Sequence, residues 1–454
     1  MSPVFQLNGR DVELAGTDPT ESLLRWLKRQ HLTGTKEGCA DGDCGACTVA
    51  LVETDASGKA HYQSVNSCLL PMGAVAGREV LTVEALADGA TLHPVQQALV
   101  DCAGSQCGYC TPGFVMSLFA GYYAGEMDDH TTEGNLCRCT GYAPIRRATA
   151  QLRETVAKPD RFAQRLLQTR TATGDMALGK FFSPVDVESA LALKQRYPDS
   201  VWIAGATDLG VNLSHGKSVA PSFIALDRIA LLKNIEVDDA TIRIGAGASL
   251  STLESQLAGL IPALDQMLPW FAARQVKNRA TLGGNLGSAS PIGDLLPLLL
   301  ALDARIELRG PRGSRDVAAD DFFLDYRKTA RADDELVISV RIPRTAHHNA
   351  AYKVAKRQTD DISIVAAVFA LGVDEQRRVE HVRLAYGGVA AVPRRATLVE
   401  HYLQGRILDK KTLLHSEHLL REAFTPLSDH RADAAYRREL CASLFAKFVA
   451  EHLP

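Results

Sequence analysis

The 454-residue sequence lacks any apolar run long enough to span a membrane. Its longest run, around Leu295 to Leu302, is far shorter than the roughly 20 residues that a membrane-spanning helix needs. The first residues, MSPVFQLNGRDVEL, also lack the basic stretch followed by an apolar stretch that marks a secretory signal peptide. We therefore expect a cytoplasmic protein.

The sequence also lacks an excess of either charge. It contains 50 basic and 53 acidic residues, for a formal net charge of −3. This balance gives no electrostatic signature of nucleic-acid binding and no polybasic membrane patch. Hydrophobic residues make up 46% and charged residues 23%, which is typical of a soluble globular protein. The length suits about three domains.

Cysteine is too scarce for a disulfide scaffold, but it is unevenly placed. Nine of the ten cysteines fall within the first 139 residues, and only Cys441 lies elsewhere. In a reducing compartment such crowding indicates metal ligation or redox chemistry rather than disulfide bridges.

A dinucleotide-binding fingerprint of the form G-x-G-x-x-G is absent as well. Gly245-Ala246-Gly247 comes close to it, but Leu250 occupies the position of the last glycine. A Rossmann-type nucleotide site is therefore unsupported.

Turn and cap signals predict that residues 1–82 form strands around a single helix. Asn8-Gly9, between VFQL and DVEL, predicts a two-residue hairpin. A second hairpin is expected to turn near Ser57-Gly58. Between them, Asp18 is expected to cap a helix, whose buried stripe consists of Leu23, Leu24 and Leu27.

Beyond residue 82 the pattern becomes helical and then mixed. Helices are expected to begin at His93-Pro94 and at Thr111-Pro112, with Thr111 as the cap of the second. Residues 156–177 show little periodicity and are interpreted as a linker. Strand-like and helical runs then alternate up to residue 345, and the last hundred residues start with strands and end in helices.

The first cysteine set has the spacing of a plant-type [2Fe–2S] ferredoxin. It reads Cys39-x4-Cys44-x2-Cys47, with Cys68 further along the chain. Glycines in this loop allow the backbone to curl around a cluster and to direct N–H groups toward its sulfurs. Structural zinc is the alternative, although zinc sites usually use two short C-x2–4-C pairs.

A second set of four cysteines is less specific by itself. Cys107-x2-Cys110 precedes an expected helix, whose N-terminus favours thiolate, and Cys137-x-Cys139 completes the set. Zinc remains an alternative here, but the position after a ferredoxin-like loop favours a second cluster. Cys102 and Cys441 have no partner at ligand spacing and are expected to be buried small hydrophobic residues.

Two segments rich in small residues could hold a pyrophosphate. One runs from Trp202 to Leu209 and the other from Thr281 to Asn285. Small residues let backbone N–H groups approach phosphate oxygens. Two tight turns without a ligand are the plain alternative.

Together these residues resemble the iron–sulfur and FAD part of bacterial xanthine dehydrogenases, within the molybdenum hydroxylase family. The stretches that carry the resemblance are TGTKEGCADGDCGACTV, GSQCGYCTPGF, GNLCRCTGYAPI, FAARQVKNRATLGGN, SPIGDLLP, DYRKT and FTPLSDHRADAAYR. The resemblance implies a multidomain α+β protein: a ferredoxin-like β-grasp [2Fe–2S] domain (1–82), a four-helix [2Fe–2S] domain (83–155), a linker (156–177), a two-part α/β FAD-binding domain (178–345) and a C-terminal α/β flavoprotein domain (346–454).

The resemblance also implies which residues contact FAD. Phe271 would lie against the flavin, although it could be plain core, and Asp294 would bind the sugar chain, although it could be a helix cap. Tyr326 would lie where nicotinamide approaches. Lys353 is expected at the surface and Val337 to act through its backbone. The full set of expected FAD contacts is Trp202, Ile203, Ala204, Gly205, Ala206, Thr207, Asp208, Leu209, Phe271, Thr281, Leu282, Gly283, Gly284, Asn285, Asp294, Val337 and Lys353.

The family's molybdopterin-binding domain has no counterpart in these 454 residues. We therefore expect a separate large subunit to oxidise xanthine or hypoxanthine at molybdenum, in a heterodimer that pairs into a dimer of heterodimers. Electrons would reach the second cysteine set first, the first set next and FAD last. NAD is the expected acceptor, with oxygen as its competitor.

Three alternatives remain at this point. The same relay could serve another molybdenum hydroxylase that acts on aldehydes or N-heterocycles. The chain could instead be a self-sufficient flavin reductase that moves electrons from NADH to a ferredoxin. Finally, it could be a binding protein with structural zinc and no enzymatic role.

Overall fold

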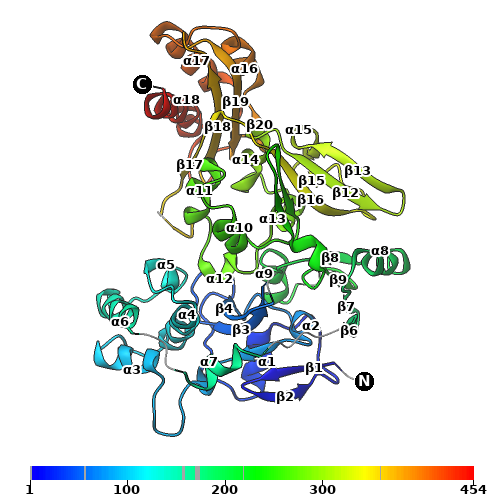
Figure 1. The fold of residues 1–454 in the computed structure, drawn as a ribbon, viewed down its shortest axis with the longest axis vertical. Coiled ribbons are helices and arrows are strands. Elements are labelled where there is room, and N and C mark those ends of the chain that lie inside the picture. Colours follow the sequence, from blue (N-terminus) through cyan, green and yellow to red (C-terminus); the bar gives the residue numbers. More distant parts are fainter. Residues whose placement is uncertain are drawn as a thin grey trace. The chain divides into compact units, whose positions relative to one another are not determined.

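The computed structural model describes residues 3–55, 58–155, 159–168, 174–217, 219–357 and 359–453 (Figure 1). The chain forms two compact units. Unit 1 consists of Met1–Ala230 and Ala272–Ala280, and unit 2 consists of Leu231–Phe271 and Thr281–Pro454. The segment Ala272–Ala280 therefore belongs to unit 1, although both of its neighbours in sequence belong to unit 2.

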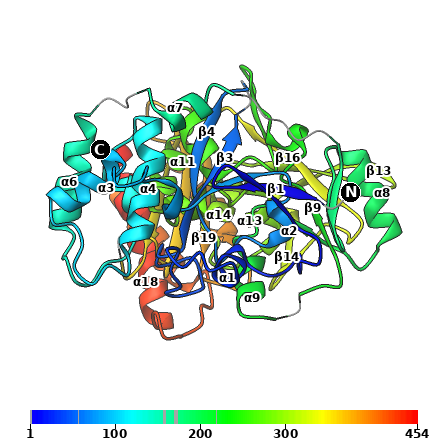
Figure 2. The same ribbon diagram turned by 90° about the horizontal axis from the view of Figure 1, so that it is seen from below.

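Unit 1 begins with a five-stranded mixed sheet in the order β2-β1-β5-β3-β4. Three of its strands, β1, β3 and β4, are labelled in Figure 2. Its strands are β1 Val4–Leu7, β2 Arg10–Glu13, β3 Thr48–Thr54, β4 Ala60–Asn66 and β5 Glu79–Leu81. Asn8 and Gly9 have positive φ angles of 53° and 79°, so the predicted two-residue hairpin is confirmed. The hairpin of β3 and β4 also forms, but Ser57, at its expected turn, lies outside the described residues.

Helix α1 (Leu23–Arg29) buries the expected leucine stripe, but it begins later than predicted. Its cap is Ser22, whose hydroxyl accepts a hydrogen bond from the Arg25 amide, whereas Asp18 accepts from the Thr20 amide in a local turn. Ser22 forms a β-bridge with Pro71. This pairing keeps the backbone before Leu23 extended, so a helix cannot start at Asp18.

The next part of unit 1 is helical. The helix predicted to begin at His93-Pro94 forms as α3; His93 is its cap and Gln96 completes a capping box. The following helix, α4, is capped by Cys110 rather than by Thr111, because the Thr111 hydroxyl donates instead to Ser105. The elements are α2 Met72–Val75, η1 Val83–Ala85, α3 Pro94–Asp101, α4 Thr111–Ala124, α5 Asp129–Thr132 and α6 Ala143–Arg153.

The expected linker at 156–177 contains a short helix, α7 (Arg161–Arg165). Asp160 caps it by accepting from the Phe162 and Ala163 amides. Residues 156–158 and 169–173 of this linker lie outside the described residues. A four-stranded sheet in the order β6-β7-β9-β8 follows, with parallel pairing from β7 to β8. Unit 1 is completed by β6 Met176–Leu178, β7 Phe181–Ser183, α8 Val187–Arg196, β8 Val201–Ile203, α9 Leu209–Ser214, β9 Phe223–Ala225 and α12 Arg274–Lys277.

Unit 2 begins with an antiparallel five-stranded sheet in the order β10-β11-β16-β12-β13 and a small β14–β15 hairpin. Its strands are β10 Ile235–Val237, β11 Thr241–Gly245, β12 Arg305–Gly310, β13 Gly313–Ala318, β14 Phe323–Asp325, β15 Lys328–Thr329 and β16 Leu336–Pro343. Its helices are η2 Ala230–Lys233, which straddles the unit boundary, α10 Leu250–Gln256, α11 Pro262–Met267, η3 Leu268–Trp270, α13 Leu282–Ser288, α14 Leu295–Ala301 and α15 Ala319–Phe322.

The C-terminal part of unit 2 is an antiparallel sheet, β17-β18-β19-β20, with three helices that share its core. These elements are β17 His348–Val354, β18 Val365–Val373, β19 Val379–Gly387, β20 Arg394–Arg395, α16 Thr397–Leu403, α17 Lys410–Glu422 and α18 Ala434–His452. The whole is a multidomain α+β architecture with mixed sheets, as predicted.

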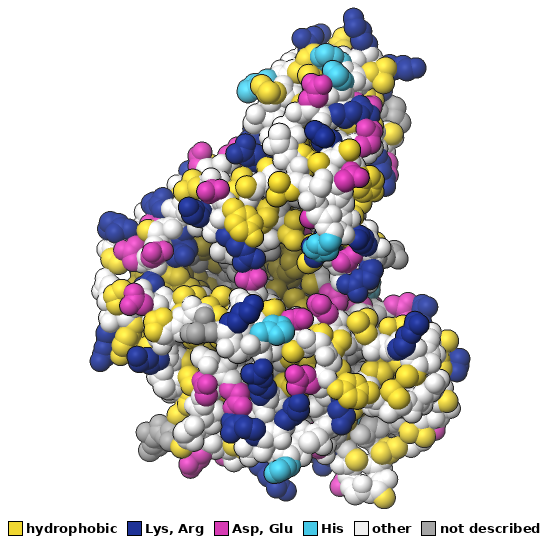
Figure 3. All heavy atoms as spheres, turned by 180° about the vertical axis from the view of Figure 1, so that it is seen from behind, with side chains coloured by type: hydrophobic (Ala, Val, Ile, Leu, Met, Phe, Trp, Pro, Cys, Tyr) yellow, Lys and Arg dark blue, Asp and Glu magenta, His cyan; other side chains and the backbone are white. Residues whose placement is uncertain are grey.

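Two further observations on the described residues bear on function. Across the described residues, none of the helices combines the length and the apolar character that crossing a membrane requires. On the face drawn in Figure 3, basic and acidic side chains are intermingled, as the near-zero net charge implies.

His93 is predicted to make stability depend on pH. Its side chain is buried and its Nε2 lies 2.9 Å from the Tyr123 hydroxyl. Burial disfavours the imidazolium and lowers the pKa of His93 to about 4. Between pH 6.5 and about 4 the unfolded chain therefore binds a proton that the folded chain does not, so stability is lost as pH falls through this window.

We expect this loss to be on the order of 2–3 kcal/mol. The measurement is the free energy of unfolding against pH, for the natural chain and for His93→Gln. The glutamine variant should show a flatter profile below pH 6.5. If the unfolding free energies of the two proteins fell equally with pH, His93 would not be the source of the pH dependence.

Candidate functional site

The first cysteine set lies on the loop between α1 and β3 and just after β4, and it forms two pairs. Cys47 and Cys68 are buried together in an apolar cluster, while Cys39 and Cys44 are half-buried. The Cys39 amide points at the Cys44 sulfur, at 3.3 Å. The loop therefore directs backbone N–H groups toward the sulfurs, as expected from its glycines.

The thiols of this set are electrostatically coupled in the same pairs. The Cys44 thiol lowers the pKa of Cys39 to about 5, and the pKa of Cys44 rises correspondingly. Cys68 lowers the pKa of Cys47, while its own pKa is raised. One thiolate is thus favoured in each pair, and thiolate is the form that binds metal.

The second cysteine set also forms two pairs, and Cys107 and Cys110 of this set directly precede α4. The sulfurs of Cys107 and Cys139 are 3.4 Å apart and both residues are exposed. A backbone hydrogen bond from Tyr109 lowers the pKa of Cys107. Burial raises the pKa of Cys110 to about 12, and its partner is Cys137.

Four thiols arranged as two pairs fit a two-iron cluster better than a single zinc ion. Structural zinc needs four ligands around one point, whereas a [2Fe–2S] cluster takes two cysteines on each iron. The donor sets therefore fit the clusters predicted from their spacing.

The segments that carry the two cysteine sets are in direct backbone contact. A methyl group added at Gly113, in the first turn of α4, would overlap the Gly45 carbonyl oxygen, so only glycine fits there. The Leu136 amide donates to the Cys44 carbonyl at 3.0 Å. Leu136 directly precedes Cys137, so this hydrogen bond joins a cysteine of one set to the neighbour of a cysteine of the other.

A buried amide network seals this junction, and sequence reasoning missed it. The Asn135 side chain donates to the Gly45 carbonyl at 3.0 Å. Gln275, from the returning segment Ala272–Ala280, donates to Ser117 at 3.0 Å and to Asn135 at 3.1 Å. Gln275 is 1% exposed. Its position in the run FAARQVK carries no local signal of this long-range role.

In unit 1, the segment from Trp202 to Leu209 spans β8, a tight turn and the start of α9. A methyl group at Gly205 would overlap the backbone carbonyl of Arg279. The Trp202 indole N–H is buried without a hydrogen-bond partner among the described residues. An unsatisfied buried donor is uncommon, and a bound cofactor would satisfy it.

In unit 2, the segment Thr281–Asn285 opens helix α13. The Thr281 hydroxyl accepts from the Gly284 amide at 2.9 Å, so it serves as the helix cap. The Asn285 side-chain oxygen is buried and has no partner in the described part of the chain. Helix N-termini favour phosphate, and the orphaned oxygen would accept a hydrogen bond from a hydroxyl or N–H group of a bound ligand.

Asp294 and Lys353 are brought together in unit 2, which the sequence did not indicate. The Lys353 ammonium lies 2.8 Å from the Asp294 carboxylate and 2.9 Å from the Trp270 carbonyl, next to Phe271. The Lys353 side chain is only 5% exposed, so the expectation of a surface lysine is wrong. Asp294 stands at the N-cap position of α14 but makes no side-chain capping hydrogen bond to a described amide; its carboxylate accepts from Ser363 instead.

Other expected positions are placed as follows. Phe271 is half-buried, Val337 is buried in β16 beside a register shift with β12, and Tyr326 is exposed between β14 and β15. Cys441 is buried, as predicted. Cys102 is only half-buried, which corrects the expectation of a buried residue.

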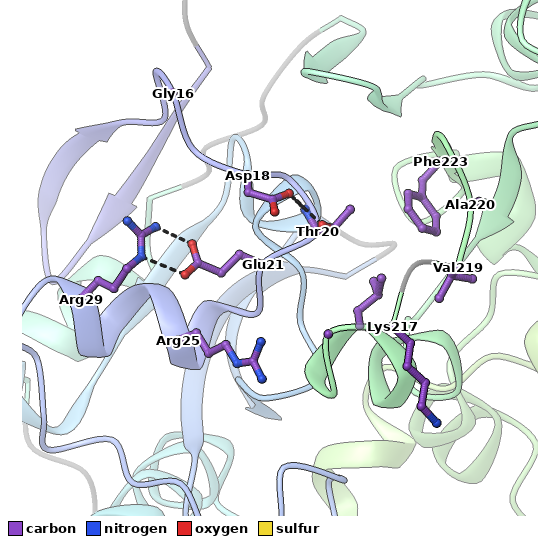
Figure 4. A pocket seen from close by; sticks show the side chains of 12 residues that line it. Gly16, Asp18, Thr20, Glu21, Arg25, Arg29, Lys217, Val219, Ala220 and Phe223 are labelled. Atoms are coloured by element: carbon purple, nitrogen blue, oxygen red, sulfur yellow. Dashed lines mark hydrogen bonds and ion pairs between the residues drawn. The ribbon is translucent and has the colours of Figure 1, made fainter.

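Unit 1 also contains a pocket of about 630 Å³ between α1 and the end of α9 (Figure 4). Arg29 and Glu21 pair along its wall, with the Arg29 Nε 2.8 Å from the carboxylate. Its described lining includes none of the cysteines and none of the expected FAD contacts.

Four family models match successive parts of the chain. A 2Fe–2S iron–sulfur cluster binding domain matches residues 5–73 and a [2Fe–2S] binding domain matches 82–150. The FAD binding domain in molybdopterin dehydrogenase matches 175–345, and the CO dehydrogenase flavoprotein C-terminal domain matches 350–452. The chain belongs to the molybdenum hydroxylase family. It carries the two [2Fe–2S] domains and the FAD-binding domain of that family.

Known proteins of related sequence and structure agree with this assignment. The molybdenum hydroxylase chain is 32% identical to xanthine dehydrogenase of Emericella nidulans, over 99% of this chain and 38% of that protein. It is 31% identical to xanthine dehydrogenase 1 of Arabidopsis thaliana, over 94% of this chain and 38% of that protein. CO dehydrogenase from Oligotropha carboxidovorans superimposes with a TM-score of 0.57 at 26% identity, over 61% of this chain and 98% of that chain. The chain thus spans about two fifths of the curated relatives' length.

The cysteine pairs in this molybdenum hydroxylase predict the result of removing single thiols. Two clusters amount to about four irons per chain. Cys139→Ser removes one ligand of the second set and should lower the iron content to about two, measured as iron and acid-labile sulfide. Cys102→Ser, outside both sets, should keep about four. Equal iron in both variants would contradict the ligand assignment.

The buried Lys353–Asp294 pair predicts a large effect on stability. Asp294→Ala leaves a buried ammonium without its carboxylate, which costs about 3–5 kcal/mol. The measurement is the free energy of unfolding of the FAD-free chain in denaturant.

Asp334→Ala is the matched control, because Asp334 pairs with Arg312 at an exposed position of the same unit. It should change the free energy of unfolding by less than about 1 kcal/mol. If both variants lose equally little, Lys353 and Asp294 do not form a buried pair in solution.

Proposed function

We propose that this chain is the electron-transfer subunit of a xanthine dehydrogenase. A partner subunit would oxidise xanthine or hypoxanthine at molybdenum, and this chain would carry the electrons to NAD. The observation that supports this substrate is the 31–32% identity, over 94–99% of the chain, to proteins named xanthine dehydrogenase.

The exposure of the two cysteine sets supports an order of transfer. Cys107 and Cys139 are exposed, so electrons from a partner would arrive at the second set. The first set holds the buried Cys47 and Cys68, and it would receive them next. When bound, the clusters carry single electrons and FAD collects two, which it can give to NAD as a hydride. The hydrogen bond from Leu136 to Cys44 supplies a short connection between the two sets.

The assembly and the location are part of the same proposal. The partner would be a large molybdopterin-binding subunit, and two such heterodimers would pair. The cytoplasm suits this chain because thiols stay reduced there, and all ten cysteines are free in the structure.

A second candidate is the same relay in a molybdenum hydroxylase that acts on another substrate. The fold likeness to CO dehydrogenase from Oligotropha carboxidovorans supports it. The partner's substrate pocket would decide between the two candidates. A self-sufficient NADH–ferredoxin reductase is distinguished by full activity without any partner.

The deciding experiment uses the chain purified with its natural partner. Xanthine and NAD are added without oxygen, and NADH formation is followed together with the ratio of iron to flavin. NADH formation with about four irons per FAD supports the relay, the substrate and the acceptor. The same ratio without turnover overturns xanthine as the substrate and favours other heterocycles, aldehydes or CO.

Cys110→Ser tests the order of transfer. It should abolish the second cluster and stop xanthine-driven NAD reduction. Reduction of an artificial acceptor by NADH through FAD should persist, because that route does not need the second cluster. Survival of xanthine-driven NAD reduction in this variant would show that the order is wrong.

A further inference from the structure

Leu69 connects the first cysteine set to helix α9. It directly follows Cys68, and its side chain is 5% exposed. It packs with Cys47 and Cys68 in one apolar cluster, and Val211 of α9 packs against that cluster. Helix α9 begins at Leu209, the last residue of the segment expected to bind the FAD pyrophosphate. All of these residues lie in unit 1.

The closest approach is at Gly210, where backbone meets backbone. A methyl group added at Gly210 would overlap the carbonyl oxygen of Leu69 and lie 3.0 Å from its carbonyl carbon and 3.1 Å from its Cα. The obstacle is main chain rather than the end of a flexible side chain. Any larger residue at 210 must therefore displace α9 from the chain that carries Cys68.

The Leu69 side chain fills the space on the other side of this contact. A methyl group added at Gly42, in the loop that carries Cys39 and Cys44, would lie 2.6 Å from its terminal carbon. Leu69 thus occupies the whole distance between the cysteine loop and α9.

We propose that Gly210 and Leu69 are positioning residues that set the separation between the first cluster and FAD. This inference rests on the proposed function, since it requires FAD to bind at Trp202–Leu209. Each transfer moves one electron, which oxidises the reduced cluster and reduces the flavin. Two transfers and one proton from water complete the reduction. Electron tunnelling slows steeply with distance and across gaps, so a glycine at 210 keeps the transfer fast.

The test compares Gly210→Ala with the natural chain, each assembled with its partner. Pulse radiolysis reduces the bound groups within microseconds, and absorbance then follows how electrons equilibrate between the clusters and the flavin. Gly210→Ala should keep its irons and its FAD and equilibrate several-fold more slowly. The electron paramagnetic resonance signals of the two reduced clusters should be unchanged.

Leu213→Ala is the matched control, because Leu213 lies on the same helix but packs into a different core. It loosens α9 without meeting Leu69 and should equilibrate at the natural rate. Equal slowing in both variants would overturn the inference, because helix loosening alone would then explain it.

Leu69→Ala keeps the inference testable if Gly210→Ala does not fold or does not hold FAD. This substitution leaves a cavity between the cysteine loop and α9 without a steric clash, and it should also slow the equilibration of electrons between cluster and flavin. If Gly210→Ala holds FAD and its electrons equilibrate at the natural rate, the positioning role is overturned. If only Leu69→Ala folds, a natural rate of equilibration in that variant overturns it. A natural chain that holds no FAD overturns the proposed function instead.

Discussion

Direct contact between backbones at Gly45 and Gly113 is the constraint on which the arrangement of the two cysteine sets depends. Two polar main chains can approach this closely only if no side chain intervenes and if their donors and acceptors find partners. Asn135 provides such a partner by donating to the Gly45 carbonyl, and Gln275 in turn donates to the Asn135 side-chain oxygen. The carbonyl of Cys44 is satisfied by the Leu136 amide, so each loop completes the hydrogen bonding of the other.

A second buried network ties the rest of unit 1 together through charge. Asp227 accepts from Arg78 at 2.6 Å and from Arg279 at 2.8 Å, and Glu53 pairs with Arg78. Desolvating four charges is costly, and such networks contribute more to specifying one arrangement than to net stability. Here the network fixes the first sheet, the second sheet and the returning segment to one another.

The parts of this fold that the sequence revealed are those encoded by local chemistry. Asn8-Gly9 dictates its turn and His93-Pro94 its helix start, because each signal lies within a few residues. The helix start predicted from Asp18 was wrong, because the β-bridge between Ser22 and Pro71, which are 49 residues apart, keeps the backbone extended up to Ser22. Lys353 and Gln275 were misplaced or missed for the same reason: their partners are distant in sequence, and an isolated lysine or glutamine gives no sign of burial.

The returning segment Ala272–Ala280 has a consequence for the synthesis of this protein. The ribosome finishes Ala230 well before it makes Gln275 and Arg279, yet both of those side chains fill buried sites among the earlier residues. Proteins generally fold domain by domain as they emerge, but this unit cannot close on its own N-terminal portion. Until residue 280 has left the exit tunnel, the cysteine loops lack the Gln275 side chain, and Asp227 lacks one of its two arginine partners. The period during synthesis in which the cysteine loops stay open to solvent therefore extends across the start of the second unit.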